Sequence, residues 1–261
     1  VAHTFEDGPN PVTAKGRETT RNLNERILQP FGEIIDKTVD SYNRVGIIST
    51  KRQHFLSEFK NIPVANQTEG IWIACWRLGF PATFLREEHF ANELEGFDII
   101  FVPGIRYDGE LDDDKLKRLR EAIASGTKVV VEQGGALELP GIIKLDDWPL
   151  TDYFIGTYFP TWADDELNKV YELSQPITDY LRVRFKEWKT EPAARGPFTV
   201  GPSWRQGGRI QYLVMGNFED PKYGHTVRQQ MARPVVMPLE IVAHRGKVAY
   251  DLIHQKELVV E

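Results

Sequence analysis

A carboxylate and an amide side chain follow one apolar run of this chain where that run ends in a glycine turn. Glu132 and Gln133 come directly after the β-branched run Lys128 to Val131 and directly before Gly134-Gly135. Glycoside hydrolysis needs two carboxyl groups that face each other across a cleft. The carboxylates nearest to the ends of the apolar runs are Glu132, Glu138, Asp146 and Asp147. Their abundance alone does not show that two of them meet.

A second group of side chains could bind a ligand without reacting with it. Arg106 and Tyr107 follow the turn Pro103-Gly104, and an aromatic stretch extends from Trp148 to Trp162. Aromatic rings can stack on the apolar faces of sugar rings, but such a stretch also suits a packed seam between domains. The candidate binding residues are Glu132, Gln133, Arg106, Tyr107, Trp148 and Trp162.

The elements expected to position these residues form a strand, helix, strand unit. Asp98 to Pro103 and Lys128 to Val131 are apolar strands, and Leu111, Leu116, Leu119 and Ile123 lie at helical spacing between them. Asp112 to Asp114 at the start and Gly126 at the end suit the two ends of a helix. Two apolar strands joined by a helix indicate a parallel sheet covered on both faces. Ligands of such sheets bind beyond the carboxyl ends of the strands, at 104–107 and 132–136 here.

The preceding segments extend this pattern. Residues 1–20 are polar and suit an extended arm, and Arg21 to Ser41 reads as one or two helices broken at Pro30. Val45 to Ser49 and Ala82 to Leu85 read as strands on either side of a helix from Glu69 to Leu78. The order predicts an α/β fold, a three-layer α/β/α sandwich with Val45 to Ser49, Asp98 to Val102 and Lys128 to Val131 as central strands.

The pattern changes after Pro140-Gly141. Ile142 to Trp162 has no clean period and reads as a loop-rich connection, and Asp164 to Glu166 marks a further helix start. Strand signals dominate from Gln175 onward and predict a C-terminal antiparallel sheet or small sandwich. Its expected strands are Tyr180 to Phe185, Gln211 to Met215, Val235 to Val242 and Lys247 to Ile253. We therefore expect an N-terminal arm and helix over 1–43, an α/β domain over 44–150, and a connection with a β-rich region over 151–261.

The phrases FDIIFVPG, LDDDKLKRLREAIASGTKVVVEQGG and GFPATFLREEHF carry a family resemblance. Together with VGIIS, their order resembles the class I glutamine amidotransferase-like, flavodoxin-like fold, in the version found as the trimerisation domain of bacterial beta-galactosidases. The end of the chain, RQGGRIQYLVMGNF and VAYDLIHQKELVV, is similar to the β-sandwich that follows in many glycoside hydrolases. The resemblance covers about 45–135 and, less specifically, 198–261. It implies an accessory region of a carbohydrate-active protein whose catalytic barrel is absent from this chain.

One departure from the catalytic amidotransferases bears on activity. Those enzymes place a nucleophilic cysteine in a glycine-flanked elbow after the strand that corresponds to Lys128 to Val131. Glu132 or Gln133 stands at that place here, and neither can attack an amide as a thiolate does. The one cysteine, Cys75, lies between Trp72 and Trp76 and reads as a buried small hydrophobic residue. The sequence therefore favours a chain without catalytic activity of its own.

Composition and spacing argue against several other classes. The net charge of -6 offers no basic stripe for a nucleic acid, and no apolar run reaches the length that spans a bilayer. The six histidines show no metal-binding spacing, and Gly134-Gly135 lacks the remainder of a phosphate-binding loop. We expect neither a metal nor another cofactor. A single cysteine excludes an internal disulfide but does not indicate the compartment.

Three functions remain open from the sequence. The first is a non-catalytic accessory or oligomerisation module of a glycoside hydrolase-like protein, whose partner is a further copy of the chain or a missing catalytic domain. The second is a hydrolase that uses carboxylates near Glu132 on a carbohydrate. The third is a stand-alone sugar-binding protein that uses the aromatic stretch. An exposed Glu132 in a cleft would favour the second function, and a Glu132 held in a closed turn would favour the first.

Overall fold

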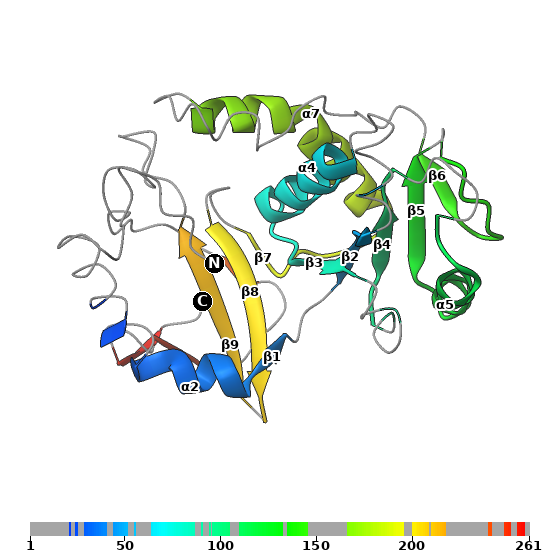
Figure 1. Ribbon diagram of the computed structural model, residues 1–261. Helices are drawn as coiled ribbons and strands as arrows, with labels where there is room; N and C mark the ends of the chain where they lie inside the picture. The colour runs from blue at the N-terminus through cyan, green and yellow to red at the C-terminus, as the bar shows by residue number, and fades with distance from the viewer. Residues whose placement is uncertain are drawn as a thin grey trace.

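A five-stranded parallel sheet is the largest sheet among the described residues (Figure 1). The computed structural model describes residues 21, 24–25, 29–40, 44–51, 55, 64–86, 90, 94, 96–104, 110–132, 135–145, 166–195, 200–208, 210–217, 240–241, 248–251 and 255–258. The strands of the sheet are β2 (Val45–Ile48), β3 (Ala82–Leu85), β4 (Ile99–Val102), β5 (Lys128–Glu132) and β6 (Ile143–Leu145). They lie in the order β3-β2-β4-β5-β6 and all neighbouring pairs are parallel. This is the strand order of flavodoxin-like folds.

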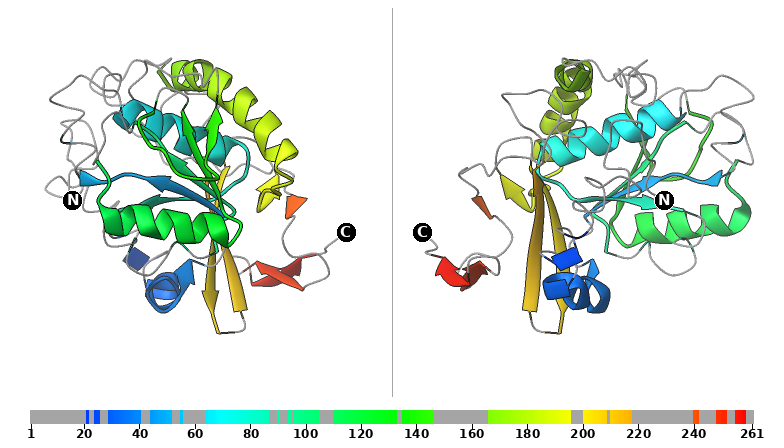
Figure 2. Two further views of the ribbon diagram at one scale, coloured as in Figure 1. Left: turned by 90° about the vertical axis from the view of Figure 1, so that its right-hand side faces the viewer. Right: turned by 60° about the vertical axis from the view of Figure 1, so that its left-hand side comes forward.

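Helices cover both faces of this sheet. Helix α5 (Asp113–Ala124) lies on one face, and α4 (Val64–Arg77) and α7 (Glu166–Glu187) lie on the other (Figure 2). Successive strand residues point to opposite faces, so Ile100 packs toward α5 while Ile99 and Phe101 pack toward α4 and α7. All residues of β2 and β4 are buried, as expected for central parallel strands. The predicted three-layer α/β/α architecture is therefore confirmed.

The ends of α5 follow from the residues that the sequence places there. The side chain of Asp112 accepts a hydrogen bond of 3.0 Å from the backbone N–H of Lys115 and so caps the first turn. Gly126 ends the helix with a φ of +103°, in the left-handed region that favours glycine. Leu119 and Ala122 are buried against the sheet, whereas the charged residues of the helix other than Lys115 are exposed. Sequence and structure agree closely for this helix.

Helix α7 occupies a segment for which the sequence predicts a strand. The prediction for Tyr180 to Phe185 is wrong, because alternation at 181, 183 and 185 matches a strand as well as a helix in so short a window. The structure separates the two readings: Leu181 and Phe185 are buried, whereas Val183 is 54% exposed. With Ile177 they form a stripe at intervals of four residues that packs on the sheet. Pro176 lies inside this helix and did not prevent it from forming.

The sheet has one more strand than the sequence predicts. Ile143–Leu145 forms β6, which pairs with Val130 to Glu132 of β5, although Ile142 to Trp162 reads as a loop-rich connection. The prediction is wrong for this part of the stretch. Three residues that alternate half-buried, exposed and buried give too short a pattern to recognise without the neighbouring strand. Residues 146–162 lie outside the described ranges.

Antiparallel strands from both ends of the chain form a second sheet beside the first (Figure 1). Strands β8 (Val200–Gly207) and β9 (Ile210–Asn217) form a hairpin, and β1 (Val39–Asp40) pairs with β8 after helix α2 (Gln29–Lys37). The guanidinium of Arg205 donates to the hydroxyl of Thr38 at 2.8 Å and to its carbonyl at 2.6 Å. The N-terminal helix is thus fastened to the C-terminal hairpin, a contact that sequence patterns within one segment do not reveal.

Short antiparallel pairs complete the described elements. Strand β7 (Ala194–Arg195) pairs with β10 (Glu240–Ile241), and β11 (Ala249–Asp251) pairs with β12 (Lys256–Leu258). A packed C-terminal sandwich and the domain limits at 43 and 150 stay predictions. None of the described helices combines the length and the apolar character that crossing a bilayer requires.

Candidate functional site

Buried polar side chains gather at the carboxyl edge of the parallel sheet. Strands β2, β4 and β5 end there, and α4 begins there because it follows β2 and returns antiparallel to it. Five of the ten buried polar or charged residues of the described ranges follow these strands or lie near the start of α4: Thr50, Gln67, Thr68, Glu110 and Glu132. Buried polar groups need specific partners, so this edge is the place in the fold where a site is expected.

Glu132 is the centre of this group. It is the last residue of β5, and its side chain is only 5% exposed. The side-chain amide of Gln67 donates to its carboxylate oxygen Oε2 at 3.4 Å, a long hydrogen bond between two buried groups. The backbone N–H of Gly135 donates to the carbonyl of Glu132 at 3.0 Å and closes the turn after the strand. The carboxylate is therefore held by Gln67 of α4 rather than presented to solvent.

The position of α4 gives a physical reason for a carboxylate at this point. Gln67 lies near the start of the helix, where unpaired backbone N–H groups give the helix end a partial positive charge. A carboxylate is a side-chain type that such a helix end favours, and Glu132 contacts the helix through the side chain of Gln67. The contact also links the end of β5 to the helix that follows β2, and β4 lies between these two strands in the sheet.

One atom of the contact is left without a partner. Gln67 is 3% exposed, and its carbonyl oxygen Oε1 is buried and accepts no hydrogen bond from the described residues. An unsatisfied buried acceptor costs about 1–3 kcal/mol of stability. Such groups are rare in folded proteins and often mark a place where water or a ligand binds.

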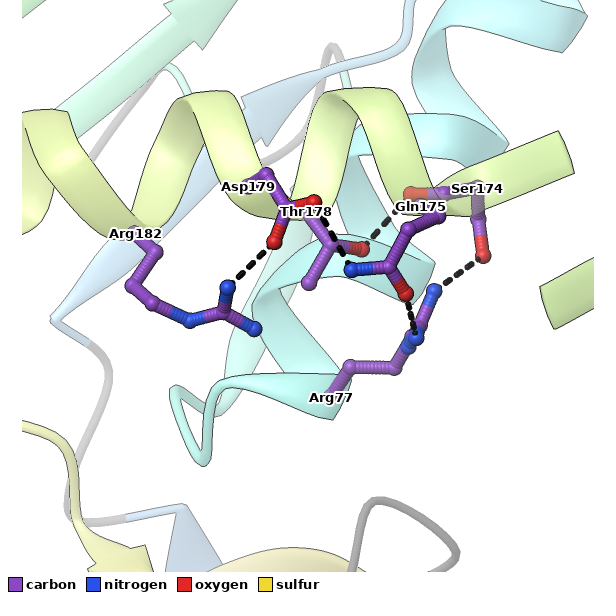
Figure 3. A network of polar contacts seen from close by, with 6 residues as sticks. All are labelled: Arg77, Ser174, Gln175, Thr178, Asp179 and Arg182. Carbon is purple, nitrogen blue, oxygen red and sulfur yellow. Dashed lines mark hydrogen bonds and ion pairs between the residues drawn. The ribbon is translucent and has the colours of Figure 1, made fainter. Parts of the chain in front are cut away.

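Polar side chains at the other end of α4 hold the helix against α7 (Figure 3). The guanidinium of Arg77 donates to the hydroxyl of Ser174 at 2.8 Å and to the side-chain carbonyl of Gln175 at 2.5 Å. The amide of Gln175 donates in turn to Asp179 at 2.8 Å, and Arg182 donates to the other oxygen of Asp179. The hydrogen bond from Gln175, and then the charge and hydrogen bond of Arg182, lower the pKa of Asp179. The network fixes the helix that carries Gln67.

Cys75 lies away from the carboxyl edge, on the sheet-facing side of α4. It is fully buried in the apolar cluster that α4 and α7 form with the sheet. Burial raises the pKa of the Cys75 thiol far above its ordinary value, so the reactive thiolate does not form near neutral pH. The interpretation of Cys75 as a small core residue is confirmed.

The structure describes one of the six predicted site residues. Glu132 lies at the predicted strand end, whereas Gln133, Arg106, Tyr107, Trp148 and Trp162 lie outside the described ranges. Among the other carboxylates near the strand ends, Glu138 is exposed and forms an ion pair with Lys144.

Sequence reasoning missed Gln67, which belongs to the same stripe of α4 as Ile71 and Cys75. The predicted helix began at Glu69, whereas α4 begins at Val64. With the earlier start, the sequence would have shown a polar side chain on the sheet-facing stripe of the helix. A polar residue among apolar ones on the buried side of a helix was the signal that could have identified Gln67.

The described ranges contain no group of three or more side chains that could hold a metal ion. All six histidines lie outside these ranges, so the expectation that the chain binds no metal stays a prediction.

Comparisons with known proteins add little to this description. No family model matches the chain, and no curated protein matches it. A proposed sugar-phosphate isomerase from Listeria monocytogenes is a structural match with 9% sequence identity and a TM-score of 0.28. The match covers 65% of this chain and 88% of that protein. A likeness this low carries no argument about fold or function, and the fold rests on the strand order described above.

Proposed function

We propose that this chain is a non-catalytic accessory or assembly module of a carbohydrate-active protein. The observation that carries the proposal is the state of Glu132. This residue stands at the end of β5, where the amidotransferases that the sequence resembles hold their nucleophile, and it is buried and hydrogen-bonded to Gln67. A nucleophile at that place must point at the reacting atom of a substrate, and the carboxylate of Glu132 instead accepts from Gln67 and joins α4 to the sheet.

The same observation weighs against a carboxylate-based hydrolase. A glycosidase needs two carboxyl groups that reach the scissile bond and the attacking water. Glu132 is 5% exposed and its carboxylate accepts from Gln67, while Glu138 is paired with Lys144 on the surface. Cys75 offers no alternative nucleophile, because it lies within the apolar layer between α4 and the sheet.

The assembly part of the proposal rests on the family resemblance. The related domain of beta-galactosidases joins subunits, and a stable interface needs at least about 1,000 Å² of buried surface with an apolar centre. We place that centre in the aromatic stretch Tyr153 to Trp162, which lies outside the described ranges. The partner is a further copy of the chain or a catalytic domain. Closed symmetry favours a dimer or a trimer for the first case.

Activity assays test the non-catalytic part. The purified chain is incubated with glutamine and, separately, with a panel of nitrophenyl glycosides, and ammonia and nitrophenol are measured. We expect neither product above the background of a Glu132→Gln variant. Glycoside hydrolysis that disappears in this variant, while its circular dichroism spectrum is unchanged, would establish the hydrolase alternative in place of our proposal.

Sedimentation tests the assembly part. The chain is sedimented over a range of concentrations together with Tyr158→Ala and Trp162→Ala. We expect a dimer or trimer that both substitutions weaken. A strict monomer at high micromolar concentration excludes self-association and leaves only the version with a missing catalytic domain. That version fails if the natural gene encodes nothing beyond these residues.

A further inference from the structure

We propose that the first turn of α4, together with Gln67 and Glu132, binds a hydroxyl group of a neutral polyhydroxylated ligand such as a simple sugar. This inference rests on the proposed carbohydrate function and assigns a binding site within it. It needs no reaction and no cofactor. Its basis is a buried acceptor to which none of the described residues donates, placed near the start of a helix.

Gln67 is directed inward by its place on the helix. The side chains of α4 that face the sheet recur at intervals of three or four residues: Gln67, Ile71, Ala74 and Cys75 are all buried. Ile71, Ala74 and Cys75 pack on strand residues. Gln67 reaches instead to the end of β5, where its amide nitrogen lies 3.4 Å from Glu132. Its carbonyl oxygen is therefore held at the carboxyl edge, and no described residue donates to it.

The charges around this oxygen select the chemistry of the ligand. The N–H groups of the first turn of α4 have no partner within the helix and favour an acceptor or a negative charge. Glu132 and the carbonyl of Gln67 favour a donor and oppose a negative charge. An anion is thus repelled by Glu132, and a cation by the positive end of the helix. A neutral hydroxyl group meets both demands, because it accepts from an N–H group and donates to Gln67 Oε1.

Nuclear magnetic resonance titration of the full chain tests this assignment. Glucose, galactose and mannose are added to the ¹⁵N-labelled protein, with glucuronate and glucosamine as charged analogues of glucose. We expect at least one neutral sugar to shift the side-chain NH₂ signals of Gln67 saturably, together with backbone signals of the first turn of α4. The charged analogues of a sugar that binds should bind more weakly than that sugar.

Variants locate the binding. Gln67→Met keeps the volume of the side chain and removes its acceptor, and Gln206→Met makes the same change at an exposed position on β8. Loss of one neutral hydrogen bond should weaken sugar binding roughly 2- to 12-fold in Gln67→Met. Binding should be unchanged in Gln206→Met. If Gln67→Met does not fold, the Gln67 signals of the unmodified protein decide the question alone.

Three outcomes would overturn the assignment. Shifts that do not saturate for any neutral sugar at high millimolar concentration would mean that water alone occupies the acceptor. Sugar binding that leaves the Gln67 signals unmoved, or that Gln67→Met does not weaken, would place the site elsewhere. Equal binding of the charged analogues would refute the charge argument. None of these results touches the accessory role, which is tested by product formation and sedimentation.

Discussion

Replacing Phe185 by alanine tests whether α7 is an integral layer of the α/β sandwich. The side chain is 2% exposed, and its ring centroid lies 4.1 Å from that of Phe80 and 6.3 Å from that of Phe101. Truncation of a buried phenylalanine removes its transfer free energy and leaves a cavity, at a total cost of about 3–5 kcal/mol. We expect Phe185→Ala to lower the free energy of unfolding by this amount, which is a large part of the stability of a typical domain.

Urea unfolding followed by tryptophan fluorescence measures the effect. Val183→Ala is the matched control, because Val183 lies on the same helix but is 54% exposed. A surface substitution of this kind changes stability by about 0.5 kcal/mol or less. If the two variants were equally stable, α7 would not pack on the sheet as described, and the assignment of residues 166–187 to this layer would be wrong.

A fragment of residues 44–150 extends the same test to the predicted domain limit. Without α7, the face of the sheet that contains Ile47 and Phe101 loses the cover of Ile177, Leu181 and Phe185. We expect the fragment to show exposed apolar surface, measured by binding of the dye ANS, whereas residues 44–190 should not. A fragment 44–150 that unfolds cooperatively without binding the dye would contradict this expectation.

Four further perturbations have definite expected outcomes. Ile100→Asp should abolish the folded state, because it buries a charge at a fully buried position of β4; an unchanged melting temperature would refute the strand assignment. Cys75→Ser should cost about 1–3 kcal/mol by urea unfolding, since it buries a hydroxyl in an apolar layer, and the thiol of the unmodified chain should react with iodoacetamide only in denaturant. Gly79→Ala should lower the melting temperature, because Gly79 has a φ of +79° and an added Cβ would lie 1.8 Å from a backbone oxygen of β7. An unchanged melting temperature would mean that this turn can move away from β7 at little cost. The hydrogen bond from Gln175 lowers the pKa of Asp179 in the folded state, so the contribution of this carboxylate to stability is present above its ordinary pKa and is lost as the pH falls through the folded value. Asp179→Asn should remove this part of the pH dependence of the free energy of unfolding. Identical pH profiles of the variant and the unmodified protein would refute this expectation.

The central sheet was predictable because its strands carry strong local signals. Strands β2, β4 and β5 are continuous apolar runs that end in polar or glycine residues, and the caps of α5 lie in the sequence at its ends. A strand buried on both faces appears as a continuous apolar run, and a capped helix carries its capping residues at its own ends, so both signals lie within a few residues of sequence. The place of Glu132 at the end of β5 could be read for the same reason.

The features that only the tertiary structure decided, namely helix α7, strand β6 and the contact at Glu132, depend on residues far apart in the sequence. The period of α7 was ambiguous until the sheet showed which of its side chains are buried, and β6 needed the edge of β5 to be recognised. The contact of Gln67 with Glu132 joins residues 65 positions apart, and burial at that contact encloses one acceptor to which no residue in the described ranges donates. A sequence by itself determines which segments have apolar faces; which face covers which, and which polar groups are enclosed between them, depends on packing across the whole chain.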